Sequence, residues 1–119
     1  MTTKNLNVTC IGAGVIGSGW AARLLVNGIN VTVFDEQPES YHRTNSSIKR
    51  AKKYLSQLTK APLRTIGNLT FAKSLEDALK IPNYIIESLP ENLELKRHLY
   101  KEIEEISIGS IILSSTSGF

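Results

Sequence analysis

The segment that most constrains the fold is a short apolar run followed at once by three glycines, Gly12-x-Gly14-x-x-Gly17. Residues 8–11 are typical of a buried parallel strand, and the residues after the glycines favour a helix. In such a turn the first glycine permits the bend, the second lets a pyrophosphate approach, and the third lets helix and strand pack closely. Free N–H groups at the helix N-terminus would face the pyrophosphate. The turn predicts a cofactor-binding site made of Gly12, Ala13, Gly14, Val15, Ile16 and Gly17.

A second apolar run, residues 30–34, ends in an acid, Asp35. In dinucleotide-binding units an acid follows the glycine turn after about 20 residues and binds the ribose hydroxyls of adenosine. The charge of Asp35 would repel a ribose 2′-phosphate, and no arginine follows directly to reverse that preference. We therefore expect NAD rather than NADP as the cofactor. The alternative role of Asp35 is a helix cap at the strand end.

The rest of the chain alternates between strand and helix patterns, which predicts an α/β fold with a doubly wound parallel sheet, the Rossmann NAD-binding fold. Right-handed crossovers and a strand order of 3-2-1-4-5 would put the topological reversal between the first and fourth strands. Ligands bind there, beyond the carboxyl ends of the strands. Strands are expected at residues 6–11, 30–34, 68–72, 84–88 and 110–114, and helices at 15–27, 39–58 with a possible break at 45–47, 74–80 with Ser74 as N-cap, and 92–106.

Length and composition fit one globular domain. The chain has 119 residues, 41% of them hydrophobic and 21% charged, and a formal net charge of +3. No apolar run approaches the ~18 residues that span a bilayer, and residues 1–5 do not begin a signal peptide, so a cytoplasmic location is expected. The basic residues between Arg43 and Arg64 favour a solvated helix face over a phosphate contact. We expect no nucleic-acid partner, no membrane partner and no metal, and Cys10 is expected to be a buried, inert thiol.

Two further polar stretches follow strands of the predicted sheet and converge on its carboxyl edge. Residues 87–91 run from the end of the fourth strand into the next turn, with Glu91 and Lys96 at the mouth of the cleft. Residues 114–117 follow the fifth strand, where Ser115 and Ser117 supply hydroxyls near the expected position of nicotinamide and substrate. Taken separately, these residues are also compatible with surface charges and a polar loop.

A base for hydride transfer is missing from this edge. Oxidation of an alcohol needs a group, usually histidine, to take the hydroxyl proton. His42 and His98 fall within predicted helices away from the strand ends, so we expect both to be structural. The chain can thus hold a dinucleotide but lacks an evident means of completing the reaction.

Taken together, these motifs resemble the N-terminal, NAD-binding domain of the 3-hydroxyacyl-CoA dehydrogenase family over the whole chain. The glycine turn and Asp35 match the family's landmarks, and so do the serines and threonine of residues 114–117. The E-x-x-x-E-N-L-x-x-K pattern of residues 87–96 is far more specific than the glycine turn.

The resemblance implies particular roles for residues beyond the glycine turn. In that family the second acid and the lysine of the pattern contact NAD, which carries over to Glu91 and Lys96. The serine that carries over to Ser117 contacts the reacting substrate oxygen, which makes it the catalytic residue expected here. Ser115 stands where acyl-CoA members usually carry asparagine, on the nicotinamide side of the cofactor. The family's base is a histidine in an H-x-x-N-P motif beyond the position of Phe119, paired with a later glutamate.

The resemblance also implies a larger enzyme. Residues 1–119 would be its NAD-binding domain, C-terminally truncated, without the helical domain that dimerises and closes the cleft. Within the family the motifs are closest to the L-carnitine 3-dehydrogenase branch, which implies oxidation of a small-molecule 3-hydroxyl by NAD. A short-chain 3-hydroxyacyl-CoA substrate and a non-catalytic, crystallin-like NAD-binding module remain the alternatives. The 1–119 piece alone is expected to bind NAD without turnover.

Overall fold

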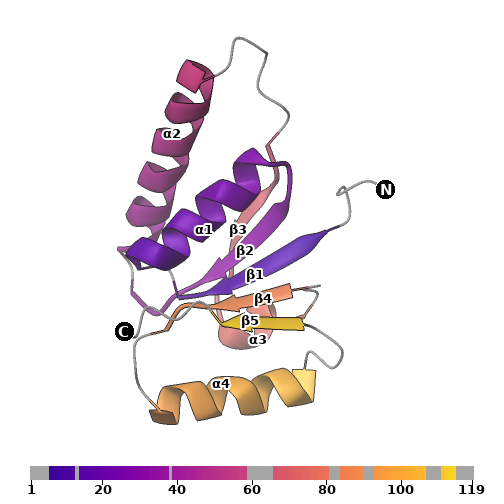
Figure 1. The fold of residues 1–119 in the computed structure, drawn as a ribbon. Helices are drawn as coiled ribbons and strands as arrows, with labels where there is room; N and C mark the ends of the chain where they lie inside the picture. Colours follow the sequence, from indigo (N-terminus) through magenta and orange to yellow (C-terminus); the bar gives the residue numbers. More distant parts are fainter. Residues whose placement is uncertain are drawn as a thin grey trace.

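The computed structural model describes residues 6–12, 14–37, 39–58, 66–80, 84–89, 93–106 and 111–114. Strands and helices alternate along the chain, as the sequence patterns predict (Figure 1). The elements are β1 (Asn7–Ile11), α1 (Val15–Val26), β2 (Asn30–Phe34), α2 (Ser40–Leu58), β3 (Leu69–Phe71), α3 (Leu75–Ala78), β4 (Tyr84–Glu87), α4 (Leu93–Ile106) and β5 (Ile111–Ser114).

The described strands form one parallel sheet in the order β3-β2-β1-β4-β5, which confirms the predicted order and fold class. The chain winds outward from β1 in one direction through β2 and β3, and in the other through β4 and β5. Ile11 at the end of β1 is in register with Phe34 of β2 and with Glu87 of β4. The reversal between β1 and β4 therefore brings three strand ends to one edge, where a doubly wound fold binds its ligand.

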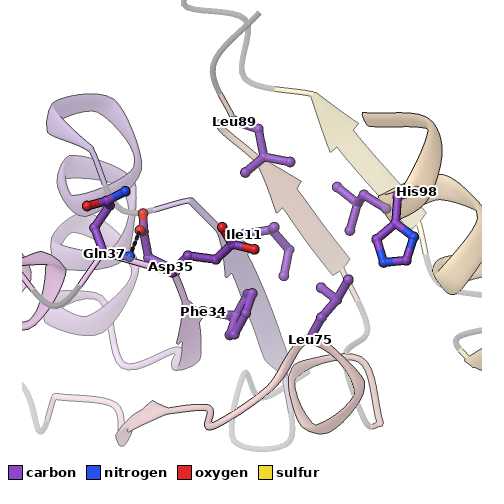
Figure 2. A pocket seen from close by; sticks show the side chains of 9 residues that line it. Ile11, Phe34, Asp35, Gln37, Leu75, Leu89 and His98 are labelled. Atoms are coloured by element: carbon purple, nitrogen blue, oxygen red, sulfur yellow. Dashed lines mark hydrogen bonds between the residues drawn. The ribbon is translucent and has the colours of Figure 1, made fainter. Parts of the chain in front are cut away.

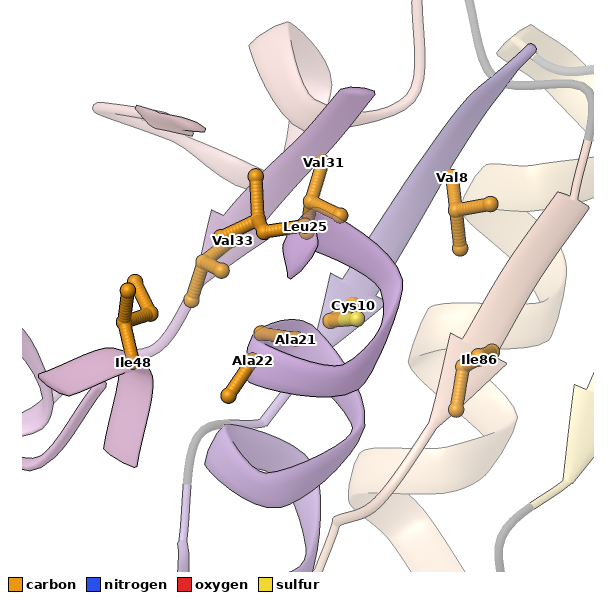
Figure 3. Packing of buried hydrophobic residues seen from close by; sticks show 9 residues of the cluster. All are labelled: Val8, Cys10, Ala21, Ala22, Leu25, Val31, Val33, Ile48 and Ile86. Carbon is orange, nitrogen blue, oxygen red and sulfur yellow. The ribbon is translucent and has the colours of Figure 1, made fainter. Parts of the chain in front are cut away.

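Helices cover both faces of the sheet, because successive strand residues point to opposite sides (Figure 1). On one face α1 and α2 pack on a cluster from β1, β2 and β4 (Figure 3). On the other face α3 and α4 pack on a second cluster that contains Ile11 and Ile85. The first cluster consists of Val8, Cys10, Ala21, Ala22, Leu25, Val31, Val33, Ile48 and Ile86.

Local chemistry explains several element boundaries. The side chain of Ser74 accepts a hydrogen bond from the backbone N–H of Asp77 at 3.1 Å, so the predicted N-cap of α3 is confirmed. Helix α1 ends just before Gly28, whose φ of +86° suits a residue without Cβ. Helix α2 runs unbroken through residues 45–47, so the possible break is wrong. The Ser47 hydroxyl donates inward to Ser18 Oγ at 3.3 Å instead of competing with the helix.

Cys10 lies in the first cluster with 1% of its surface exposed, and it forms no disulfide. Burial raises the pKa of this thiol to about 12, because the thiolate would lose its hydration. The expectation of a buried thiol is confirmed. No helix in the described part of the chain is long and apolar enough to cross a membrane.

Candidate dinucleotide-binding site

The three glycines of the turn have three different environments. Gly12 has a φ of +95°, and a Cβ added to it would lie 2.8 Å from the carbonyl oxygen of Ser88. A Cβ on Gly17 would collide with the carbonyl oxygen of Gly12. A Cβ on Gly14 would meet nothing within 4 Å. Gly12 and Gly17 are thus required by packing among β1, β4 and α1, whereas Gly14 faces open space of the kind that a pyrophosphate needs.

The start of α1 fits an anion as well. Gly14 is its N-cap residue, in an extended conformation, and provides no side-chain cap for the first N–H groups. The backbone oxygen of Gly14 accepts two hydrogen bonds from Ser18, from its N–H at 2.9 Å and from its hydroxyl at 2.7 Å, and these fix the start of the helix. Uncapped N–H groups and the positive end of the helix dipole favour a phosphate at this position. Val15 and Ile16 belong to the first turn of α1, and their side chains are outside the description.

Asp35 directly follows β2 and lines a cavity of about 240 Å³ at the carboxyl edge of the sheet (Figure 2). Its Oδ1 accepts the backbone N–H of Gln37 at 2.7 Å, which fixes the carboxylate at the strand end. The middle of the cavity is apolar. An acid beside an apolar cavity suits the ribose hydroxyls and the base of an adenosine. The lining residues are Ile11, Phe34, Asp35, Glu36, Gln37, Leu75, Leu89, His98 and Leu99.

His98 belongs to this cavity, so the expectation that it lies away from the strand ends is wrong. It is on α4 and faces the cavity from the side opposite Asp35 (Figure 2). Its neighbour Leu99 is buried against the sheet, so His98 lies beside the buried stripe of the helix at the cavity wall. His42 is exposed on α2 and does not line this cavity. The imidazole of His98 thus lies across the same cavity from Asp35.

Lys96 is brought to the same edge by a buried acid. Glu87, the last residue of β4, has only 1% of its surface exposed. Its Oε2 accepts the backbone N–H of Leu89 at 2.7 Å, and its Oε1 lies 3.8 Å from Nζ of Lys96. The family resemblance assigns a role to Lys96 but none to Glu87. A charged residue at the end of an otherwise apolar strand is the sequence pattern that could have pointed to Glu87.

One buried hydroxyl near the turn has no hydrogen-bond partner among the described residues. Ser88 Oγ is inaccessible to solvent, and the Ser88 backbone lies against Gly12. A buried hydroxyl is normally satisfied, so it is compatible with a polar group of the cofactor or with water. Among the predicted site residues, Ala13, Glu91, Ser115 and Ser117 lie outside the described residues. Among the predicted site residues that the structure describes, Gly12, Gly14, Gly17, Asp35 and Lys96 lie at or next to the carboxyl edge of the sheet.

The fold and this edge define a dinucleotide-binding domain of the Rossmann type. The family model described as "3-hydroxyacyl-CoA dehydrogenase, NAD binding domain" matches residues 7–119, and the chain belongs to this family. The cofactor is therefore NAD, in agreement with the turn and Asp35.

The chain is also similar to individual dehydrogenases within and beyond this family model. The chain is 43% identical to an L-carnitine dehydrogenase of Mesorhizobium japonicum over 91% of this chain and 30% of the relative. It is 44% identical to an L-carnitine dehydrogenase/betainyl-CoA thioesterase of Ruegeria pomeroyi, over 92% of this chain and 23% of the relative. The solved structure of 5-formyl-3-hydroxy-2-methylpyridine 4-carboxylic acid 5-dehydrogenase, an NAD+-dependent dismutase, superposes with a TM-score of 0.78 at 34% identity. That superposition covers 95% of this chain and 37% of the other. The chain spans less than a third of these two curated relatives.

Proposed function

We propose that the chain is the NAD-binding part of an enzyme that oxidises the 3-hydroxyl group of L-carnitine to a ketone. The support is the identity of 43% and 44% to proteins whose names state L-carnitine dehydrogenase activity. The catalytic base and the C-terminal, dimerising domain would come from sequence beyond residue 119. The homodimer and the cytoplasmic location stay predictions.

In this proposal the predicted site residues have separate binding tasks. The open space at Gly14 and the start of α1 receive the diphosphate, and Asp35 receives the ribose hydroxyls. Lys96 would contact the cofactor from the start of α4, and the family resemblance gives Glu91 a contact with NAD as well. Bound NAD supplies the hydride acceptor. Ser117 would hold the hydroxyl oxygen of the substrate, and Ser115 would lie on the nicotinamide side.

The observation that carries the cofactor part is the position of Asp35, tied by Gln37 at the end of β2 in the cavity wall. Asp35→Ala should weaken NAD binding by about 1.5–3 kcal/mol, the free energy of a hydrogen bond to a charged group. It should also reduce the preference for NAD over NADP, because the repulsion of the 2′-phosphate disappears. Titration calorimetry with both cofactors measures these changes, and equal or tighter NADP binding to the unaltered protein would contradict the role of Asp35.

The substrate is a separate question. A short 3-hydroxyacyl-CoA is the second candidate, favoured by the exposed basic residues of α2, such as Lys49 and Lys53, which suit an anionic carrier. A panel assay of the full-length protein with L-carnitine and 3-hydroxybutyryl-CoA distinguishes the two. Oxidation of the CoA ester alone would refute the carnitine proposal, and NAD binding without turnover of either would favour a non-catalytic module.

A further inference from the structure

The buried acid Glu87 offers an inference that rests on the proposed NAD site. A carboxylate with 1% exposure is unfavourable in a protein interior unless hydrogen bonds and an opposite charge compensate it. Glu87 has both kinds of compensation, from the N–H of Leu89 at 2.7 Å and from Nζ of Lys96 at 3.8 Å. Its two oxygens thereby connect the end of β4 to the following loop and to α4.

The lysine partner has its own need for an anion. Lys96 is in the first turn of α4, which begins at Leu93, where the positive end of the helix dipole disfavours a cation. Its side chain is also largely buried, with 19% of its surface exposed. Glu87 offsets both effects. An ammonium group carries three N–H donors, so a contact with Glu87 is compatible with a second contact to a cofactor oxygen.

The placement of Glu87 links this pair to the binding site. Glu87 is in register with Ile11, the residue before Gly12. Its neighbour Ser88 packs against Gly12, and Leu89 lines the adenosine cavity. We propose that Glu87 is a positioning residue for NAD binding, whose buried charge holds Lys96 at the cofactor edge of the sheet.

A double-mutant cycle in the full-length protein tests this inference. NAD affinity is measured by titration calorimetry for the unaltered protein, Glu87→Gln, Lys96→Met and the double variant. Gln keeps the size and an acceptor oxygen for Leu89 but removes the charge. We expect Glu87→Gln to weaken NAD binding about tenfold, as for a lost charged hydrogen bond, and to have no further effect once Lys96 is Met. Glu94→Gln removes an exposed acid from the same helix turn and is the matched control, with unchanged affinity.

Each other outcome has a distinct meaning. Equal effects of Glu87→Gln in both backgrounds would show that Glu87 does not act through Lys96, which would overturn the inference. Unchanged or tighter NAD binding by the single variant Glu87→Gln would overturn it as well. If Glu87→Gln does not fold by circular dichroism, Glu87→Asp replaces it in the cycle. Asp keeps the charge but withdraws it from Lys96, so a smaller loss is expected, again absent in the Lys96→Met background. An unaltered protein that does not bind NAD would refute the proposed function instead.

Discussion

Gly14 and Gly19 both have free space where a Cβ would stand, yet only Gly14 is at the turn between β1 and α1. Gly14→Val should therefore abolish NAD binding and leave the fold intact, because its backbone conformation suits valine and the new methyl groups fill the pyrophosphate space. Calorimetry for NAD and thermal unfolding for the fold measure the two effects. Unchanged NAD affinity in folded Gly14→Val protein would refute the phosphate role of this turn.

Gly19→Ala is the matched control for that variant. Gly19 is inside α1, where alanine in place of glycine stabilises a helix by about 1 kcal/mol. We expect a slightly more stable protein with unchanged NAD affinity. Gly17→Ala should instead lower the free energy of unfolding, because its Cβ has to displace the backbone oxygen of Gly12.

Cys10 permits a prediction about pH. Because burial raises the pKa of its thiol to about 12 from 9.0, the native protein should react very slowly with thiol reagents at pH 8 and rapidly after unfolding. The same pKa shift makes the stability of the fold depend on pH. Its stabilising effect is fully present below pH 9, where the thiol is neutral in both states, and is lost as the pH rises from 9 towards 12.

The Cys10 effect can be isolated by comparison with Cys10→Ala, since other groups also titrate at high pH. Urea unfolding at pH 8 and pH 10 should show a larger loss of stability for the unaltered protein than for the variant. An equal loss in both would mean that Cys10 does not contribute.

At the scale of an element, α4 brings two polar side chains to the cofactor edge, Lys96 and His98, beside the apolar Leu99. His98→Ala should weaken NAD binding about fivefold, because an aromatic contact with a flat base contributes about 1 kcal/mol. His42→Ala removes the same side chain from an exposed position on α2 and should leave NAD affinity unchanged. Calorimetry on both variants decides the matter, and equal affinities would remove His98 from the site.

The strands were the most predictable elements. The predicted strands 30–34 and 84–88 are rich in apolar and β-branched residues, and the observed strands end within a residue of the predicted ends. The order of the sheet is predictable because the glycine turn indicates a dinucleotide-binding fold, whose strands run in the order 3-2-1-4-5 with right-handed crossovers. The glycine turn and Asp35 were recognisable because their chemistry depends on residues close in sequence.

Most of the residues that line the cavity could not be predicted from the sequence alone. Leu99 and Ile103 form the buried stripe of α4, and which neighbouring residue faces the cavity depends on how the helix is rotated and inclined on the sheet. Polarity at Ser47 suggested a break in α2, although its hydroxyl is satisfied by Ser18 from another helix. Glu87 was unassigned for the same reason, since its partners Leu89 and Lys96 become meaningful only in three dimensions.

At the scale of the whole molecule, binding and turnover should be separable. Residues 1–119, prepared as a separate polypeptide, should bind NAD but should not oxidise L-carnitine or 3-hydroxybutyryl-CoA, because the expected base is beyond this stretch. NADH absorbance with each substrate measures turnover, and the full-length protein is the control. Robust turnover by the short polypeptide would mean that the base is within it, with His98 as the first residue to substitute.

Because β1 lies between β2 and β4 in the sheet, its two sides become paired at different times during synthesis of the chain. The glycine turn and Asp35 are complete once β2 has been made, and β1 can then pair on one side only. The other side of β1 stays unpaired until β4 has been made, and the cavity wall is incomplete until α3, the Leu89 loop and α4 have been made. A nascent chain therefore carries the phosphate turn well before it has a place for adenosine, and the unpaired edge of β1 needs protection from association until β4 emerges from the ribosome.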